Sequence, residues 1–298
     1  MNQTKQQHWV PCFYLKYFAT PDTREALDPQ VWILSKDDGA PALANIKRVA
    51  SQRYLYSLKT PDGTRNWDME NDLGKYETVM GTLWPMLATD FVELQDDEAV
   101  RKGLALFISL LYLRHPRRLV ETEESHGQLV EMFGTAPKDQ DGRPLVEGVE
   151  HNGVLRKIDT TDWHLYKGAG SEEKKEMFVK SIRQNATHLA EILIQKRWSV
   201  VFSETPVFIT TDAPVMLVHQ TREVFGFGTP GTIVSFPVSP TRVLMMDDRH
   251  DQPKGQYYPL ATTGPAFANG LAWRNCERFM LSPRHPDEVC AEILETAE

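Results

Sequence analysis

Four places in this 298-residue chain set polar or charged residues in otherwise apolar surroundings. They are His8 before an aromatic-rich segment, Glu70 and Glu77 within a helical pattern, the stretch Arg114-His115-Pro116-Arg117-Arg118, and Asp212 after a hydrophobic run. A histidine and a carboxylate can transfer protons near neutral pH, and clustered arginines can bind a phosphate-sized anion. These residue types together suit hydrolysis of a phosphodiester or another anionic substrate.

Each place also has a purely structural interpretation. His8 could tether the N-terminal segment by one hydrogen bond, and glutamates seven residues apart share a helix face that is usually solvated. The basic residues around Arg114 could simply complement the C-terminus of a helix. Asp212 could form an Asx turn before Pro214. The sequence leaves both interpretations open.

Most catalytic signatures are missing from the sequence. It has no glycine-rich phosphate loop, no GxSxG elbow, no HExxH motif and no CxxC pair. Cys12, Cys276 and Cys290 are scattered, and none has an evident base beside it, so we expect neither a disulfide framework nor a reactive thiol. The sequence does not identify a cofactor, although the candidate carboxylates could hold a divalent metal.

Composition narrows the class of protein. The 33 Lys and Arg residues against 41 Asp and Glu residues give a net charge of −8, which argues against a protein that coats nucleic acid. A local basic site stays open, so nucleic acid remains one candidate anionic substrate. The polar N-terminus lacks a signal-peptide pattern, and the apolar stretch 103–113 is far shorter than the ~20 residues of a membrane span. We therefore expect a cytoplasmic protein without a membrane segment, and the sequence does not indicate its oligomeric state.

Helical patterns dominate the first two thirds of the chain and strand patterns the last third. A short helix is predicted after Pro11 and a strand over 31–34, with a second short strand over 52–57. Longer helices are predicted from Asp68, which can cap the first turn, with a stop or kink near Pro85, from 96 or 97 to 114, and over about 171–196. Pro116 either closes the second of these helices or kinks it into a further helix. The 97–114 segment is apolar on nearly every face, which is typical of a buried central helix.

After Trp198 the sequence predicts short strands over 200–202, 207–209, 215–218, 233–236 and 243–246. A helix near 264–273, a strand over 278–281 and a closing helix over 286–295 follow. Runs of helices followed by runs of strands indicate an α+β fold, in which N-terminal and central helices pack on a mostly antiparallel C-terminal sheet. Residues 134–170 break the helical pattern with Gly, Pro and charged residues. We interpret them as an insertion or lid, with a weak hairpin pattern, within a single domain over 1–298.

Several of these motifs resemble a known family, the domain of unknown function 4238, found mostly in bacteria. The segment 7–15 is similar to its His-Tyr-x-Pro signature, with Trp9 in place of the tyrosine, and 208–215 to its Phe-Ile-Thr-Ser-Asp-x-Pro-Val element, with threonine at 211. The segment 236–240 resembles its Phe-Pro-Leu-Ser-Pro element, and the helical glutamates and 111–116 match more loosely. Leu111 and His115 stand where that family has glutamine and threonine. The resemblance spans nearly the whole chain and implies one domain, but it implies no reaction.

Our leading hypothesis is that His8, Glu77, Arg114 and Asp212 converge in one pocket. His8 would be the general acid or base, Asp212 a second carboxyl or metal ligand, and Glu77 would orient the histidine or bind the metal. Arg114, with the neighbouring basic residues His115, Arg117 and Arg118, would bind the anionic group of the substrate. Such a site suits an intracellular nuclease of the toxin or phage-defence kind.

Two other hypotheses remain open. The chain could be a non-catalytic protein that senses a small anion or a partner through the basic stretch. Alternatively, the polar residues could form a buried network that pins the N-terminal segment to the sheet, because a network of paired buried groups has the same sequence signature as a site.

Overall fold

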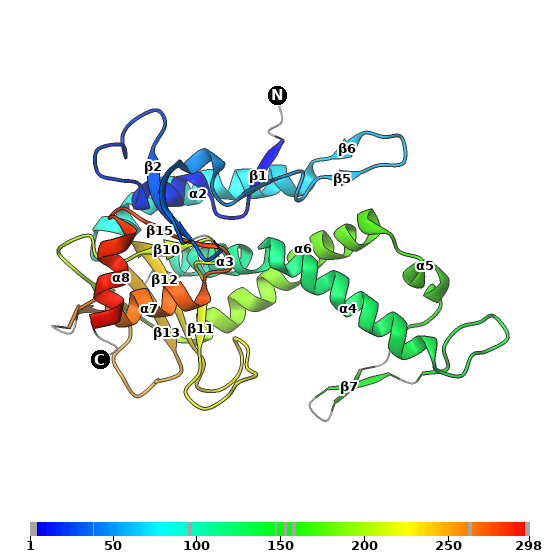
Figure 1. Cartoon of the computed structure of the whole chain (residues 1–298). Coiled ribbons are helices and arrows are strands. Elements are labelled where there is room, and N and C mark those ends of the chain that lie inside the picture. The colour runs from blue at the N-terminus through cyan, green and yellow to red at the C-terminus, as the bar shows by residue number, and fades with distance from the viewer. Residues whose placement is uncertain are drawn as a thin grey trace.

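The computed structural model describes residues 5–37, 39–94, 97–146, 148–151, 154–156, 159–261 and 264–295. Within them the chain has the predicted α+β fold (Figure 1). The helices are α1 (Cys12–Leu15), α2 (Asp68–Thr89), α3 (Glu98–Leu113), α4 (Pro116–Gly134), α5 (Trp163–Lys167), α6 (Ser171–Gln195), α7 (Ala266–Asn275) and α8 (Pro286–Glu295), with 3-10 turns η1 (Lys16–Phe18) and η2 (Ile46–Arg48). The strands are β1 (Gln6–His8), β2 (Gln30–Ser35), β3 (Pro41–Asn45), β4 (Ser51–Arg53), β5 (Leu58–Lys59), β6 (Arg65–Asn66), β7 (Val149–His151), β8 (Val154–Arg156), β9 (Arg197–Phe202), β10 (Thr210–Thr211), β11 (Met216–Val218), β12 (Ile233–Ser239), β13 (Arg242–Asp247), β14 (Gln256–Pro259) and β15 (Phe279–Ser282).

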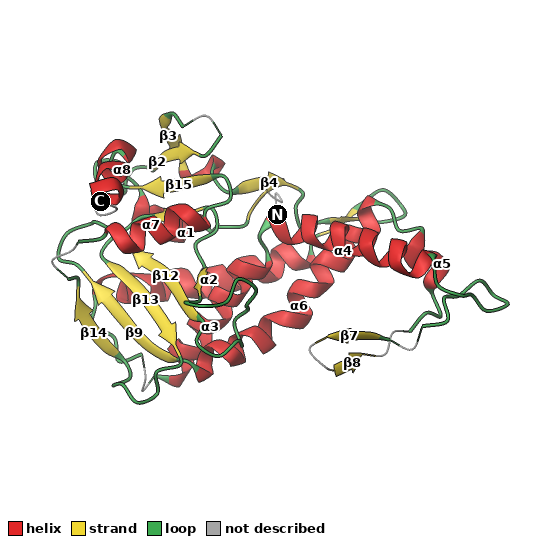
Figure 2. Ribbon diagram, turned by 60° about the horizontal axis from the view of Figure 1, so that its bottom comes forward, coloured by secondary structure: helices red, strands yellow, loops and turns green. Residues whose placement is uncertain are grey.

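The largest sheet has the strand order β11-β12-β13-β9-β14 and is antiparallel except for β14, which runs parallel to β9 (Figure 2). On one face, Phe236 of β12 belongs to an aromatic cluster with Tyr14, Trp84 and Phe107, which come from α1, α2 and α3. Aromatic pairs in edge-to-face or stacked contact dominate the energetics of such cores. The N-terminal segment is therefore part of the main core.

Helix α3 is the predicted central helix. Val100, Leu104, Phe107, Ile108 and Leu111 are all buried, as the apolar pattern around the helix requires. The side chain of Asp97 caps its first turn by accepting a hydrogen bond from the backbone N–H of Val100 (3.0 Å).

Pro116 explains how α3 passes into α4. Proline lacks an N–H and is favoured at the first position of a helix, where that donor would be unpaired. Here α3 ends at Leu113 and α4 begins at Pro116, so Arg114 and His115 form the junction. The Arg114 side chain reaches Glu77 of α2, whereas the His115 side chain caps the first turn of α4.

A second sheet, β10-β15-β2-β3, joins the two ends of the chain. Strand β10 pairs with β15 so that Thr210 lies opposite Leu281 and Thr211 opposite Met280. This pairing places Asp212 at the end of an edge strand, next to the loop between α7 and β15.

Helices α4 and α6 extend away from the sheets and carry α5 and the β7–β8 hairpin at their far ends (Figures 1 and 2). The predicted insertion over 134–170 therefore lies at the opposite end of α4 from His115. Parts of its predicted hairpin, at 147, 152–153 and 157–158, lie outside the described residues. No helix in the described part of the chain is both long and apolar enough to span a bilayer.

Some local predictions were wrong. Helix α2 continues through Pro85 to Thr89, because buried Trp84 and Leu87 hold the helix on either side of the one hydrogen bond that proline removes. Its first turn has no side-chain cap from Asp68, since Trp67 occupies the capping position. The strand expected over 207–209 is displaced to β10, and the one expected over 52–57 is shortened to β4.

Candidate functional site

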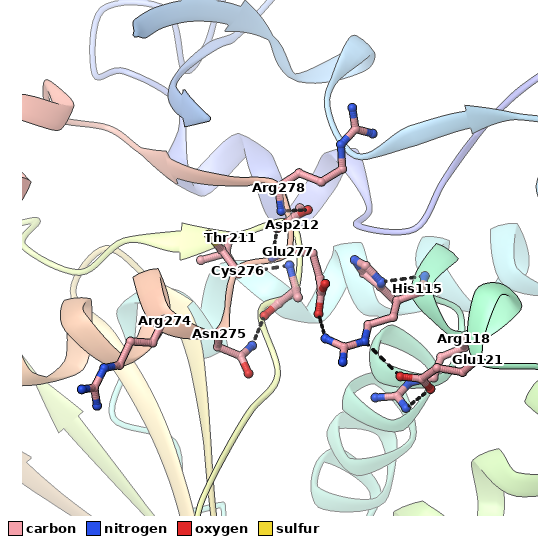
Figure 3. Close-up of polar contacts among 12 residues, drawn as sticks. His115, Arg118, Glu121, Thr211, Asp212, Arg274, Asn275, Cys276, Glu277 and Arg278 are labelled. Carbon is pink, nitrogen blue, oxygen red and sulfur yellow. Dashed lines mark hydrogen bonds and ion pairs between the residues drawn. The ribbon is translucent and has the colours of Figure 1, made fainter. Parts of the chain in front are cut away.

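A cleft of about 350 Å³ opens where the start of α4 faces the loops that follow β10 and α7 (Figure 3). Its polar wall consists of His115, Arg117, Arg118, Glu121, Asn275 and Glu277. His115 comes from the junction between α3 and α4, and the next three residues come from the first turns of α4. Asn275 ends α7, and Glu277 lies in the loop that follows. Glu223 reaches the cleft from the loop after β11. Three of the predicted substrate-binding residues, His115, Arg117 and Arg118, thus line one cleft.

His115 caps α4 and keeps one ring nitrogen without a protein partner. Its Nδ1 accepts a hydrogen bond from the backbone N–H of Arg117 (3.1 Å), which assigns the ring proton to Nε2. That Nε2 is buried and has no hydrogen-bond partner among the described residues. Burial lowers the pKa of His115 to about 4, with the charge of Glu277 acting in the opposite direction. At neutral pH the ring is therefore an uncharged donor with a spare N–H.

The two arginines of the cleft are held by glutamates. Arg117 donates from Nε to Glu121 (3.0 Å) and from Nη1 to Glu277, while Arg118 donates from Nη1 to the other oxygen of Glu121. The Arg118 guanidinium also lies over the ring of Tyr112, 4.1 Å from its centroid. Glu121 therefore fixes both guanidinium groups side by side, and each retains N–H donors beyond these bonds.

The charges of the cleft nearly balance. Two arginines stand against three glutamates, since Glu223 joins Glu121 and Glu277 and His115 is neutral. The sequence alone predicts a dense basic site, but the structure shows basic groups that are already paired with carboxylates. The cleft therefore presents oriented polar groups but has no strong positive electrostatic potential.

Asp212 is fully buried behind this cleft and does not line it. Its two carboxylate oxygens accept hydrogen bonds from the backbone N–H groups of Glu277 and Arg278 (3.0 Å each), as Figure 3 shows. Burial raises the pKa of Asp212 to about 6, and these backbone hydrogen bonds oppose that rise. The local turn is made by Thr211, whose hydroxyl accepts from the N–H of Ala213 (3.0 Å). Asp212 is thus placed to position the loop that carries Glu277.

Arg114 belongs to a second polar cluster on the other side of the junction. Its side chain is 2% exposed; Nε donates to the carbonyl oxygen of Trp9 (2.9 Å) and Nη1 to Glu77 (2.6 Å). The remaining nitrogen, Nη2, is buried without a partner among the described residues. Burial, and then the charge of Glu77, raise the pKa of Glu70 to about 7, while Arg114 lowers it. Two glutamates of α2 therefore lie in different electrostatic environments around one guanidinium.

His8 adjoins this cluster, and the charges of Glu77 and Arg114 both act on its pKa, which burial lowers. Its Nε2 lies 3.1 Å from the carbonyl oxygen of Lys47 and 3.4 Å from the sulfur of Cys12. The expectation that no cysteine has a base beside it was therefore wrong for Cys12, where the spacing of four residues was the available signal. Burial raises the pKa of Cys12 to about 11, so the thiol stays protonated and is a poor nucleophile.

Trp9 connects the two sites. Its carbonyl oxygen accepts from Arg114, its indole Nε1 donates to the carbonyl oxygen of Asp212 (2.9 Å), and its ring meets the His115 ring edge-on at 5.7 Å. The structure thus brings His8, Glu77 and Arg114 together and sets Asp212 apart. No hydrogen bond joins the Asp212 carboxylate to those three among the described residues, and none of the four lines the cleft.

Metal binding has little geometric support in the described part of the chain, which holds no group of three or more His, Cys, Asp or Glu residues suited to an ion. Sequence reasoning missed Glu121, Asn275 and Glu277 as site residues. Glu121 follows Arg117 and Arg118 at helical spacing, which was a usable signal. Nothing local marks the other two, because they reach the cleft from 160 residues along the chain.

Comparison with known proteins yields a family but no activity. The sequence model of a family described as "Protein of unknown function (DUF4238)" matches residues 6–288. Neither a search of curated proteins nor a search of solved structures found a match. The candidate site must therefore be interpreted from its own geometry.

Proposed function

This chain belongs to the DUF4238 family, and from that premise we propose that it binds a small polar ligand with one anionic group in the cleft at the start of α4. The family name assigns no reaction, so the proposal depends on the site. The observation that carries it is the pair Arg117 and Arg118, which Glu121 holds side by side in a cleft that His115 also lines. Guanidinium groups fixed by a carboxylate are pre-organised to donate to a phosphate or carboxylate.

The balance of charge decides what kind of anion fits. A polyanion would meet Glu223 and Glu277 as well as the arginines, and like charges in an interface cost affinity. A ligand with a single anionic group avoids this cost if its hydroxyl or amino groups donate to the carboxylates. The volume of about 350 Å³ falls within the range of small-molecule sites. A phosphomonoester or carboxylate of a polar small molecule therefore suits the cleft better than a nucleic-acid strand.

Calorimetric titration tests this proposal with adenosine 5′-monophosphate, inorganic phosphate and, as the uncharged control, adenosine. We expect measurable affinity for the first two, and a drop of about tenfold or more in Arg118→Gln, because one charge-assisted contact is worth about 1.5–3 kcal/mol. Arg183→Gln, on the exposed face of α6, is the matched control and should bind like the wild type. Equal affinity for adenosine and its monophosphate, or unchanged affinity in Arg118→Gln, would refute the proposal.

Hydrolysis of a phosphodiester is the second candidate function, and the position of Glu277 beside Arg117 favours it. Glu277 could take a proton from a water that attacks phosphorus, while the arginines stabilise charge on the phosphoryl oxygens. The scissile P–O bond would then break, and the leaving alkoxide would take a proton from solvent. Turnover of bis(4-nitrophenyl) phosphate and of single-stranded DNA and RNA tests this candidate, with Glu277→Gln expected to abolish it. Turnover lost in His8→Asn but kept in Glu277→Gln would instead place the chemistry at His8 and Glu77, as the sequence hypothesis has it. A nuclease of the toxin or phage-defence kind, acting in the cytoplasm, would follow only from positive turnover of nucleic acid.

A further inference from the structure

A second cavity, of about 340 Å³, lies between α7 and the face of the main sheet that points away from α2 and α3. Val243 and Met245 of β13 form its floor, and Ala268 and Leu271 of α7 cover it. Phe267 stands at its edge with 73% of its side chain exposed. The cavity shares no lining residue with the cleft at the start of α4, so it is a separate site.

The described residues that line this cavity are mostly apolar, and none of them carries a charged side chain. An ionised ligand would lose its hydration there without gaining a counter-charge, which disfavours anions and cations alike. The volume falls within the range of small-molecule binding sites. An uncharged, mainly apolar occupant therefore suits it.

Ser235 of β12 provides one polar group on this floor. The residue is 2% exposed and lines the cavity, yet its hydroxyl makes no hydrogen bond to another described residue. This hydroxyl is not among the enclosed polar atoms that lack a partner, so it borders the cavity and can bind water there. A ligand with one donor or acceptor at the matching position would satisfy it.

We propose that this cavity binds a small, uncharged, mainly apolar molecule whose single hydrogen-bonding group pairs with the hydroxyl of Ser235. Aromatic or branched aliphatic alcohols, phenols and amides have the required chemistry. The volume accommodates a two-ring aromatic compound, and buried Phe208 offers an aromatic contact in the wall. This site does not depend on the function proposed for the cleft.

Fluorescence titration with N-phenyl-1-naphthylamine, an uncharged probe that emits strongly in apolar surroundings, tests the cavity in the full chain. We expect saturable enhancement with one site per chain, and a loss of affinity of at least tenfold in Leu271→Trp and in the smaller change Ala268→Leu, because both fill the space. Leu165→Trp on exposed α5 is the matched control and should bind like the wild type. Thermal melts confirm that each variant is folded.

Methyl NMR locates the probe. With ¹³C-labelled methionine methyl groups, the resonance of Met245 should shift on titration, whereas that of Met69, in the core on the other side of the sheet, should not. Met245→Leu assigns the signal. Saturable binding without a shift at Met245, or binding that both cavity-filling variants retain, would refute the proposal. So would a dimer that Phe267→Ala dissociates and that binds no probe, because a second copy of the chain would then be the occupant.

The role of Ser235 is tested with a pair of competitors that differ in one hydroxyl group. In competition with the probe, we expect the wild type to bind 1-naphthol five- to tenfold more tightly than naphthalene. In Ser235→Ala the affinities for the two competitors should become nearly equal. A preference for 1-naphthol that survives in Ser235→Ala would show that the hydroxyl of Ser235 does not recognise the ligand.

Discussion

Replacing Glu70 by glutamine should stabilise the protein at neutral and alkaline pH, whereas the same replacement of Glu77 should destabilise it. Both residues lie on α2 near Arg114, but only Glu77 forms the ion pair with it (2.6 Å). Burial and the neighbouring Glu77 charge raise the pKa of Glu70 from 4.5 to about 7. The charged form of Glu70 is therefore less favourable in the folded protein than in the unfolded chain.

The size of the Glu70 effect follows from its pKa. When a carboxyl group has a pKa near 7 in the folded protein and 4.5 in the unfolded chain, its ionisation lowers the free energy of unfolding by about 3 kcal/mol. Because its side chain keeps some contact with solvent, which screens the charge, we expect about 1–2 kcal/mol. The pKa is raised on folding, so this stability is fully present below pH 4.5 and lost as the pH rises through about 7. Glu70→Gln should thus exceed the wild type in stability only slightly near pH 5 and by the full amount at pH 8.

The Glu77 effect has the opposite sign because Arg114 loses its partner. Breaking a buried ion pair from one side typically costs about 3–5 kcal/mol, and since the Glu77 side chain is 26% exposed we expect about 2–3 kcal/mol. This cost should persist at both pH 5 and pH 8.

Urea unfolding followed by circular dichroism at pH 5 and pH 8 measures these differences. Asp72→Asn is the matched control on the same helix, because Asp72 pairs only with exposed Lys75 and Arg183, and it should change little at either pH. A Glu70→Gln variant that is less stable than the wild type at pH 8, or equally shifted at both pH values, would contradict the electrostatic account. Stabilisation at pH 8 would show that the chain keeps a costly carboxylate beside Arg114, which is typical of functional sites.

Three further substitutions have defined outcomes. Asp247→Asn breaks a doubly hydrogen-bonded, buried pair with Arg197 (2.8 and 2.6 Å) and should cost about 3 kcal/mol at pH 7 by urea unfolding. Burial acts to raise the pKa of Asp247, but hydrogen bonds from arginine outweigh it and hold the pKa at about 2. The stability that the ionised Asp247 contributes is therefore present above pH 3.8 and lost as the pH falls through 2. Acid titration of Asp247→Asn should lack this loss of stability. Tyr14→Phe removes the hydroxyl that donates to the Pro237 carbonyl (2.8 Å) in the core and should lower stability by about 1–2 kcal/mol, and an unchanged urea midpoint would contradict that bond. Asp212→Ala leaves the backbone amides of Glu277 and Arg278 without an acceptor, so we expect the free energy of unfolding to fall by about 2–4 kcal/mol. Ligand binding in the cleft should weaken as well. Normal binding in a destabilised variant would show that Asp212 stabilises the fold without positioning the cleft.

The parts of the fold that the sequence predicts well are those with a strong local pattern. The central position of α3 follows from its apolar residues on all faces, and the start of α4 follows from Pro116. Strand β14 was missed because it is a short edge strand with mostly exposed residues and a proline at its end. Strand β10 was displaced because the backbone N–H groups of Val207 and Phe208 bind the carbonyl oxygen of Pro240 instead of a neighbouring strand.

The candidate site was predicted in part. Clustering of charge identified His115, Arg117 and Arg118 as neighbours, and the structure places all three at one cleft. The clustering of charge does not show that the Arg114 side chain points away from those three residues, because its direction depends on where α3 ends. The bonds from the Asp212 carboxylate to backbone amides 65 and 66 residues later leave no trace in local periodicity. Pairing across such distances is decided by tertiary packing, which single-sequence patterns do not contain.

The position of Trp9 also constrains how the molecule is made. Its indole bonds to a carbonyl 203 residues later, and its own carbonyl accepts from a guanidinium 105 residues later. Contacts this distant in sequence form slowly, because the entropy of closing the intervening chain must be overcome first. At a synthesis rate of about 5–20 residues per second, at least ten seconds separate the emergence of Trp9 from that of its partner. The pairing of β1 with β4 and the bond from Arg114 can form earlier, but the contact between Trp9 and Asp212 cannot. The cleft, whose far wall follows Asp212 in the chain, is therefore among the last parts of the protein to take shape.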